Sequence, residues 1–178
     1  MIRTRRTTGL RYSGIRASIA LVALAVNVGW QSPCAAQQSG SAAAQVLFEE
    51  ARQLMSAGHY AEACPKLEES QRIDPGSGTL MNLADCYEHT GRIASAWGAF
   101  LDAEAGARLV GNTAREQAAR ERSRALEPRL PRIVYQVGGH LEGLEIRRDG
   151  VLVGYPQWGT PIPIDPGDHS ITVTAPGH

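Results

Sequence analysis

The stretch Gly58-His59-Tyr60-Ala61-Glu62-Ala63 returns 33 residues later as Gly91-Arg92-Ile93-Ala94-Ser95-Ala96, and this repeat decides the first half of the fold. Around both copies, apolar residues recur at the three- and four-residue spacing of a helix with one buried face. Each copy therefore predicts two helices joined by a glycine turn. The two units cover residues 44–76 and 77–110.

The glycine that opens each copy is expected to end a helix. Gly58 and Gly91 stand where a left-handed residue terminates a helix, a conformation that glycine adopts at little cost. Ala63 and Ala96 are small, which allows the two helices of one hairpin to approach closely. Pro75 closes the first unit because proline cannot continue the preceding helix.

A fifth helix is predicted over residues 113–128, where Thr113 and Glu116 have the spacing of a capping box. Two repeats of this kind cannot bury their own apolar faces, so this helix is expected to cap them. Its arginines favour a solvated face that pairs with nearby glutamates over a site for an anionic partner. The positions expected to face inward are Ala114, Ala118, Ala125 and Leu126.

These units resemble the tetratricopeptide repeat. In the first unit the resemblance rests on Gly58, Tyr60, Ala63, Leu67 and Pro75. In the second unit it rests on Leu83, Ala84, Tyr87, Gly91, Ala96 and Phe100. Three features depart from the family: Glu50 stands where a core leucine is common, Ser70 replaces a late alanine, and the second unit has no closing proline. The resemblance implies a helical domain over residues 44–130.

The resemblance also implies a binding face, formed by the first helix of each unit. An aromatic ring, two methionines and charges of both signs suit a peptide segment. The lysine and asparagine residues that hold a terminal carboxylate in some relatives are absent, and an ordinary solvated surface is the alternative. The matching positions are Phe48, Arg52, Met55, Met81, Asp85, Glu88 and His89.

From residue 131 the chain changes from helical to strand periodicity. Asp149-Gly150 between two β-rich runs predicts a tight hairpin, because both turn positions favour positive φ. Residues 160–164 contain two prolines and predict an edge strand. Asp165-Pro166-Gly167-Asp168 predicts a turn into a last strand over residues 169–174. We therefore expect a small antiparallel β-sandwich, and an α+β class for the whole chain.

This half, residues 131–178, resembles the PEGA domain. The matching residues are Asp149-Gly150, Gly154, Thr160-Pro161, Pro166-Gly167, His169 and Ala175-Pro176-Gly177. The tetrapeptide that names the family is replaced near Gly138-Gly139, and His178 stands where an aromatic residue is usual. We expect the last strand of the domain to be missing. Two alternatives follow: a truncated fragment, or an open edge that meets another chain.

The first 36 residues have the pattern of a secretory signal peptide. Five arginines and no acidic residue precede an apolar run at 19–30, and small residues follow at its exit. The run is shorter than the roughly 20 residues that span a bilayer, so cleavage and export are favoured. The alternative is an uncleaved anchor in the inner membrane, formed by residues 19–30. A linker is expected at 37–43.

Export changes the interpretation of charge and cysteines. Without the first 36 residues, 13 of the 18 basic residues remain against all 18 acidic ones, a net charge of −5 that argues against a nucleic-acid partner. Cys64 and Cys86 are then left as an even pair in an oxidising compartment. They fall early and late on neighbouring antiparallel helices, which predicts a disulfide. Two buried thiols are the alternative.

No pattern in the sequence indicates catalysis, a cofactor or a metal. The five histidines are not at ligand spacing from cysteines or carboxylates, and no serine lies in a nucleophile elbow. The segments together resemble exported tetratricopeptide–PEGA proteins of myxobacterial type, which implies a non-enzymatic scaffold of the periplasm or envelope with an unidentified protein or peptide partner. The alternative is carbohydrate or peptidoglycan binding by the β-domain, with Tyr155 and Trp158 as a stacking platform.

Overall fold

The computed structural model describes residues 34–138 and 142–176, and side chains from residue 41 onward. All the described helices and strands belong to one compact unit. The predicted signal sequence up to residue 33, with its possible anchor at 19–30, lies outside the described residues. No helix in the described part is long and apolar enough to cross a membrane.

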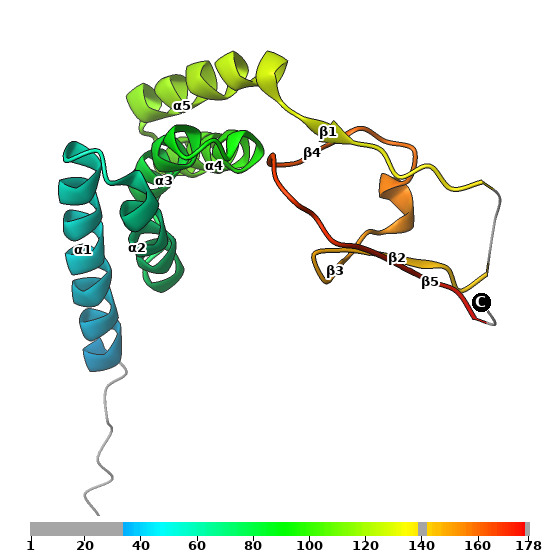
Figure 1. Cartoon of the computed structure of the whole chain (residues 1–178). Coiled ribbons are helices and arrows are strands. Elements are labelled where there is room, and N and C mark those ends of the chain that lie inside the picture. The colour runs from blue at the N-terminus through cyan, green and yellow to red at the C-terminus, as the bar shows by residue number, and fades with distance from the viewer. Residues whose placement is uncertain (1–33, 139–141, 177–178) are drawn as a thin grey trace, which may run out of the picture. The chain divides into compact units, whose positions relative to one another are not determined.

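Within residues 34–138 and 142–176, five helices precede a small antiparallel sheet region, which confirms the α+β class (Figure 1). A short 3-10 helix, η1 (Glu127–Arg129), follows the last of them. The helices are α1 (Cys34–Ser56), α2 (Tyr60–Ile73), α3 (Ser77–His89), α4 (Ile93–Leu109) and α5 (Thr113–Leu126). Helix α1 runs through residues 37–43, where the sequence indicated a linker. Ala42, Ala43 and Ala44 favour the helix intrinsically at the end of this segment.

Three helices end in the same way, on a glycine with positive φ. Gly58 has a φ of 81°, Gly91 of 78° and Gly111 of 69°. In each turn the next residue donates its amide five residues back, as His59 does to Leu54 and Arg92 to Tyr87, both at 2.8 Å. These bonds satisfy carbonyls that the helix end leaves open. The predicted left-handed stops at Gly58 and Gly91 are confirmed.

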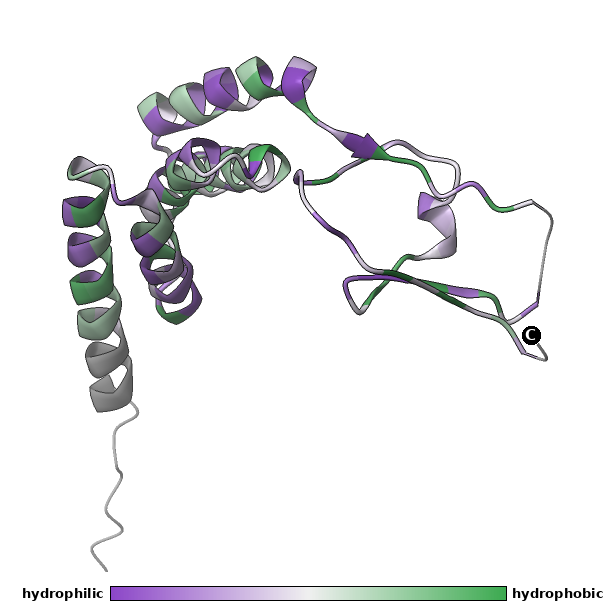
Figure 2. Cartoon of the chain, viewed as in Figure 1, coloured by the Kyte–Doolittle hydropathy of each residue, from purple (hydrophilic) through white to green (hydrophobic). Residues whose placement is uncertain are grey.

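The helical core consists of small and branched residues that lie between the hairpins. Ala63, Ala96, Leu67 and Phe100 are all fully buried, which confirms that the two alanines permit close approach. Hydrophobic and hydrophilic residues alternate around α1 and α5, as expected of helices with one buried face (Figure 2). Ser70, which replaces an alanine of the family pattern, is buried as well.

The face that α5 buries differs from the prediction. Ala119, Ser123 and Leu126 are buried, whereas Ala114, Ala118 and Ala125 are exposed, so only Leu126 was assigned correctly. The helix begins with Asn112 rather than Thr113 as its N-cap residue, and Asn112 accepts the amide of Arg115 at 3.0 Å. Alanines lie on more than one face of α5, so periodicity alone does not determine which face packs against α4.

The β region contains two antiparallel sheets. The strands are β1 (Arg132–Ile133), β2 (Glu145–Arg148), β3 (Val151–Leu152), β4 (Ile162–Pro163) and β5 (Ile171–Thr174), and a 3-10 helix, η2, covers Tyr155–Gln157. β1 pairs with β4, and β2 lies between β3 and β5. Asp149 has a φ of 51° and Gly150 of 79°, which confirms the predicted hairpin between β2 and β3.

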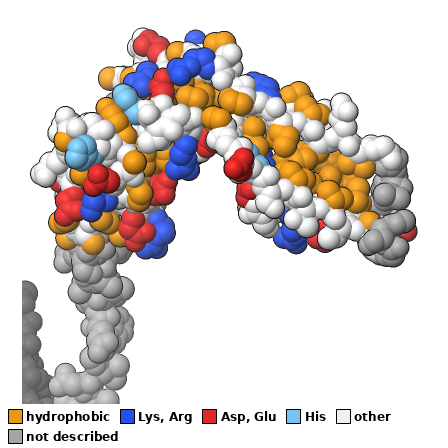
Figure 3. All heavy atoms as spheres, viewed as in Figure 1, with side chains coloured by type: hydrophobic (Ala, Val, Ile, Leu, Met, Phe, Trp, Pro, Cys, Tyr) orange, Lys and Arg blue, Asp and Glu red, His pale blue; other side chains and the backbone are white. Residues whose placement is uncertain are grey.

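The core of the β region is small. Tyr135, Ile146 and Val153 are buried, and Trp158 and Ile162 pack against them. Many other hydrophobic side chains of this region lie at the surface, where they gather on the face shown in Figure 3. Ile171 and Val173 of β5 remain 43% and 57% exposed, so the sheet is only partly covered along this strand.

Candidate binding surfaces

The predicted binding face of the helical half has one row of residues on α1 and another on α3. Phe48, Arg52 and Met55 are four and seven residues apart and therefore share one side of α1. Phe48 and Met55 are partly buried against the helical core, as is Met81 of α3. The guanidinium carbon of Arg52 lies 5.9 Å from the centre of the Phe48 ring. Each row thus presents apolar surface at positions accessible from outside.

The acidic part of this face is occupied by one arginine of α5 and one of η1. Arg122 donates to Asp85 and to Glu88, both at 2.9 Å, and Arg129 donates to Glu88 at 2.9 Å. Arg122 also lies 4.8 Å above the ring of Phe100. Burial alone would raise the pKa of Glu88, but the hydrogen bonds from both arginines outweigh it and lower this pKa below its usual value.

These arginines were missed as part of the face. The sequence signal was the basic run of α5, which was expected to pair with glutamates of its own neighbourhood. Arg120 does pair with Glu116, at 2.6 Å, but it also pairs with Glu104 of α4, at 3.0 Å. The helix therefore ties together acids of α3 and α4 as well as its own.

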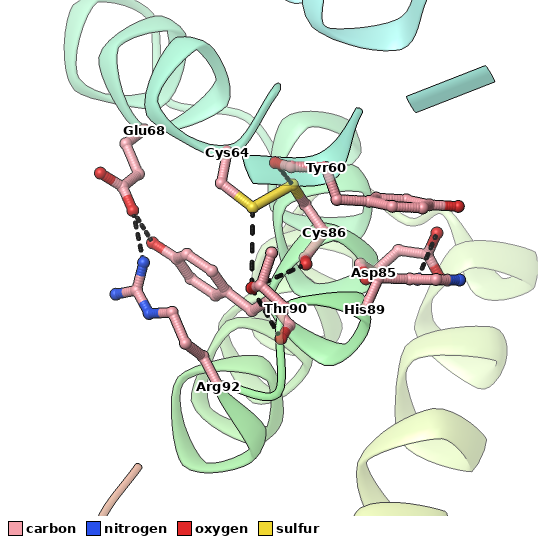
Figure 4. The surroundings of a disulfide bond; sticks show 9 residues. Tyr60, Cys64, Glu68, Asp85, Cys86, His89, Thr90 and Arg92 are labelled. Atoms are coloured by element: carbon pink, nitrogen blue, oxygen red, sulfur yellow. Dashed lines mark hydrogen bonds and ion pairs between the residues drawn. A yellow bond between two sulfur atoms is a disulfide. The ribbon is translucent and has the colours of Figure 1, made fainter. Parts of the chain in front are cut away.

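His89, the last predicted residue of the face, is stacked on an aromatic ring of α2. The ring centres of Tyr60 and His89 are 4.0 Å apart and their planes differ by 9° (Figure 4). Nδ1 of His89 lies 2.9 Å from the carbonyl oxygen of Asp85. The stack fixes the orientation of the imidazole and joins α2 to α3 at the edge of the face.

A disulfide between Cys64 and Cys86 lies beside this stack and confirms the predicted pairing (Figure 4). Its Cα atoms are 5.7 Å apart, and the two residues are 4% and 0% exposed. Tyr60 precedes Cys64 by one helical turn and His89 follows Cys86 by about one turn, so the disulfide and the stack join the same two helices. The bond therefore fixes the contact between the two hairpins covalently.

Tyr87 and Arg92 form a polar cluster on the other side of the disulfide. The Tyr87 hydroxyl donates to Glu68 at 2.9 Å, and Arg92 donates to the same carboxylate oxygen at 2.9 Å while lying 4.0 Å above the Tyr87 ring. Burial, and then the Glu68 carboxylate, raise the pKa of Tyr87 to about 12, against the opposing effect of Arg92. The phenol is therefore neutral at physiological pH and acts as a hydrogen-bond donor.

The β region contains a groove that includes both predicted platform residues. Its volume is about 430 Å³, and its lining comprises Glu142, Gly143, Leu144, Glu145, Leu152, Val153, Gly154, Tyr155 and Trp158. The rings of Tyr155 and Trp158 meet edge to face, with centres 5.2 Å apart. Trp158 donates its indole N–H to Val153 at 3.2 Å and is held in place, whereas Tyr155 is 69% exposed.

The described side chains provide no metal site, since no group of three or more His, Cys, Asp or Glu residues is arranged to hold an ion there. The fold and these surfaces thus define an α+β chain with a disulfide-linked helical half and a small β region. Comparison of the chain with protein-family models, with curated proteins and with solved structures finds no match.

Proposed function

We propose that this chain is a non-enzymatic interaction scaffold of the bacterial cell envelope, which binds a peptide or protein segment on the α1–α3 face. The observation that carries the proposal is that Phe48, Met55 and Met81 pack against the helical core and yet are only partly buried. Charged groups accompany them on the same helices: Arg52 lies 5.9 Å from the Phe48 ring, and the Asp85 carboxylate of α3 is bound by Arg122. Apolar anchors surrounded by charge are what a docked segment requires.

The finer assignment of the helical half, as two tetratricopeptide-type repeats and a capping helix, belongs to this proposal. Two features support it: the turns at Gly58 and Gly91 have the same bonds at the same spacing, and fully buried alanines follow each turn. The assignment of the β region as PEGA-like is supported by the Asp149-Gly150 hairpin and the edge strand β4. It makes the β region a second module beside the binding half.

Export to the periplasm or envelope is supported by the disulfide, because such bonds persist in oxidising compartments. Intact mass of the native protein tests this point. We expect a chain that begins near Gln37, with Cys64 and Cys86 protected from alkylation until they are reduced. A full-length chain with free thiols would contradict export, and a full-length chain with an intact disulfide would favour the membrane-anchored alternative.

The binding proposal is tested with a random peptide library displayed on phage and selected on the whole chain. Selected peptides are then measured by calorimetry against Phe48→Ala and Met81→Ala. Loss of an apolar anchor is expected to weaken binding about tenfold, or about 1.4 kcal/mol. Leu109→Ala is the matched control, because Leu109 is 88% exposed and lies on α4, outside the face. Unchanged affinity in both face variants would refute the proposed face.

A second candidate function, carbohydrate or peptidoglycan binding, is favoured by the groove of the β region. Tyr155 offers an exposed ring beside the fixed Trp158, and Glu142 and Glu145 belong to the same lining. Aromatic rings pack against the C–H faces of sugars, and carboxylates accept hydrogen bonds from hydroxyl groups.

This second function predicts that the whole chain co-sediments with purified peptidoglycan and that Tyr155→Ala abolishes co-sedimentation. Val151→Ala is the control, because Val151 is 67% exposed in the same region but does not line the groove. This second function would be refuted if the Tyr155→Ala variant still co-sedimented with peptidoglycan, or if the parent chain did not co-sediment.

A further inference from the structure

The N-terminus of α4 is capped by a residue from the distant β region. The backbone amide of Ser95 donates to one carboxylate oxygen of Asp165 at 2.9 Å, and the Ser95 hydroxyl donates to the other. Arg92 lies 3.7 Å from the same carboxylate. The N-cap residue of α4, Arg92, makes no side-chain capping bond to this described helix, so an acid 70 residues further along the chain performs this role. An acid is favourable there because helix N-termini carry partial positive charge.

The turn that carries Asp165 is in turn held by His169. Nε2 of His169 lies 2.8 Å from the carbonyl oxygen of Asp165, and Nδ1 lies 2.7 Å from the carboxylate of Asp149. Both partners are acceptors. A neutral imidazole has a single N–H, so only the imidazolium donates to both partners at once.

The charges around His169 favour its protonated form. The carbonyl of Asp165, and then the carboxylate of Asp149, raise the pKa of His169 above its ordinary value, against burial and the nearby Arg148. Asp149 is fixed by the backbone amide of Ser170 at 3.0 Å, and Arg148 lies 4.0 Å from its carboxylate. Hydrogen bonds from His169 and then from Ser170 lower the pKa of Asp149. The groups that face the imidazole are thus Asp149, Arg148 and Asp165.

We infer that His169 is an acid-stabilised latch, whose imidazolium holds the Asp165 turn so that the Asp165 carboxylate caps α4. When His169 loses its proton, one of its two nitrogens becomes an acceptor that faces an acceptor. One bond is lost, and the Asp165 turn is released from its fixed position. The contact between the β region and α4 then weakens, so the relative position of the peptide-binding half and the β region becomes dependent on pH.

The direction of the pH dependence follows from both shifts. The pKa of His169 is raised in the folded chain, so its imidazolium stabilises the fold. This stabilisation is complete below the ordinary imidazole value of about 6.5 and is lost as pH rises through the raised pKa. Because the pKa of Asp149 is lowered, its contribution is lost as pH falls through that lowered value. The latch is therefore closed at pH values between the lowered pKa of Asp149 and the raised pKa of His169.

The test is a pH titration of the whole chain by NMR, which follows the imidazole nitrogens of His169 and the amide of Ser95. The latch predicts that His169 titrates above about 6.5 with both nitrogens protonated in the acid form. It also predicts that the Ser95 amide shift changes with the same midpoint, because that amide donates to Asp165. In His169→Gln this midpoint should vanish from Ser95, whereas the exposed His59→Gln should leave it in place.

Two results would overturn the latch: a His169 that titrates at or below the ordinary value, or a Ser95 amide that does not follow it. If His169→Gln fails to fold, the titration of the parent chain decides the question alone. The latch does not depend on what the chain binds, so its failure leaves the proposed function untouched.

Discussion

Ser70 is a polar residue inside the helical core, at a position where the family pattern has alanine. It is 2% exposed, and its hydroxyl donates to the carbonyl oxygen of Ala44 on α1 at 2.8 Å. This bond joins the two helices of the first hairpin, since Ala44 lies in the middle of α1 and Ser70 late in α2. The serine therefore provides a hydrogen bond where alanine would provide only a packing contact.

Ser70→Ala removes this bond and leaves the Ala44 carbonyl with one partner fewer in a buried site. We expect a loss of about 1 kcal/mol in the free energy of unfolding, measured by urea denaturation. Ser56→Ala is the control, because Ser56 also donates to a carbonyl, that of Gln53, but is exposed. Equal effects of the two substitutions would show that burial of the Ser70 bond is unimportant.

The glycine turns allow a comparison of two substitutions with opposite signs. Gly91 has a φ of 78°, and a Cβ added there would meet no atom of the described structure within 4 Å. The cost of Gly91→Ala is therefore conformational alone, about 1 kcal/mol.

Gly98 lies inside α4 and has the same free space in the described structure, but an ordinary helical φ. Gly98→Ala should stabilise by up to about 1 kcal/mol. The melting temperatures of the two variants test both expectations. A lower melting temperature for Gly98→Ala as well would contradict the free space around Gly98.

At the scale of elements, the helices were largely predictable and the contacts between them were not. The helix ends at Gly58 and Gly91 depend on residues adjacent in the sequence, because a glycine after an amphipathic run is sufficient to indicate them. The pairs Arg122–Glu88 and Ser95–Asp165 join residues 34 and 70 positions apart, and no periodicity links such partners. The prediction of the buried face of α5 was wrong because alanines lie on more than one of its faces, and only packing against α4 selects between them. The predicted face residues occupy accessible sites, and binding by them stays a prediction.

The disulfide is the element-scale feature with the largest expected effect on stability. It closes a loop of 22 residues between α2 and α3, which corresponds to about 3 kcal/mol on the chain-entropy model. The double substitution Cys64→Ser with Cys86→Ser should lower the free energy of unfolding by about this amount in denaturant titrations. A reducing agent should destabilise the parent chain similarly and leave the double variant unchanged. A reductant effect in the variant would contradict this explanation.

On the scale of the whole molecule, burial is unevenly distributed. Among the described side chains, the helical half has a cluster of 14 buried hydrophobic residues and a covalent link, whereas the β region has a cluster of three. Local opening costs more free energy where more apolar surface is buried. The two halves therefore differ in stability although they belong to one compact unit.

Hydrogen exchange followed by mass spectrometry is expected to resolve this difference. Amides of α2, α3 and α4 should exchange more slowly than those of β2 and β5, because the strands lie over a smaller core. Reduction of the disulfide should accelerate exchange in α2 and α3 and leave the strands unaffected. Equal protection in both halves before reduction would contradict the uneven distribution.

The same disulfide has a consequence for the chain under mechanical tension. A pulling force on the two termini passes directly from Cys64 to Cys86 through the sulfur atoms, and the segment between them carries none of it. A chain extends by at most about 3.5 Å per residue, so the bond withholds roughly 70 Å of contour length from stretching. The turn at Pro75 and Gly76 lies within that protected segment. Tension can peel α1 from the array and straighten the β region, yet the contact between the two hairpins stays tethered.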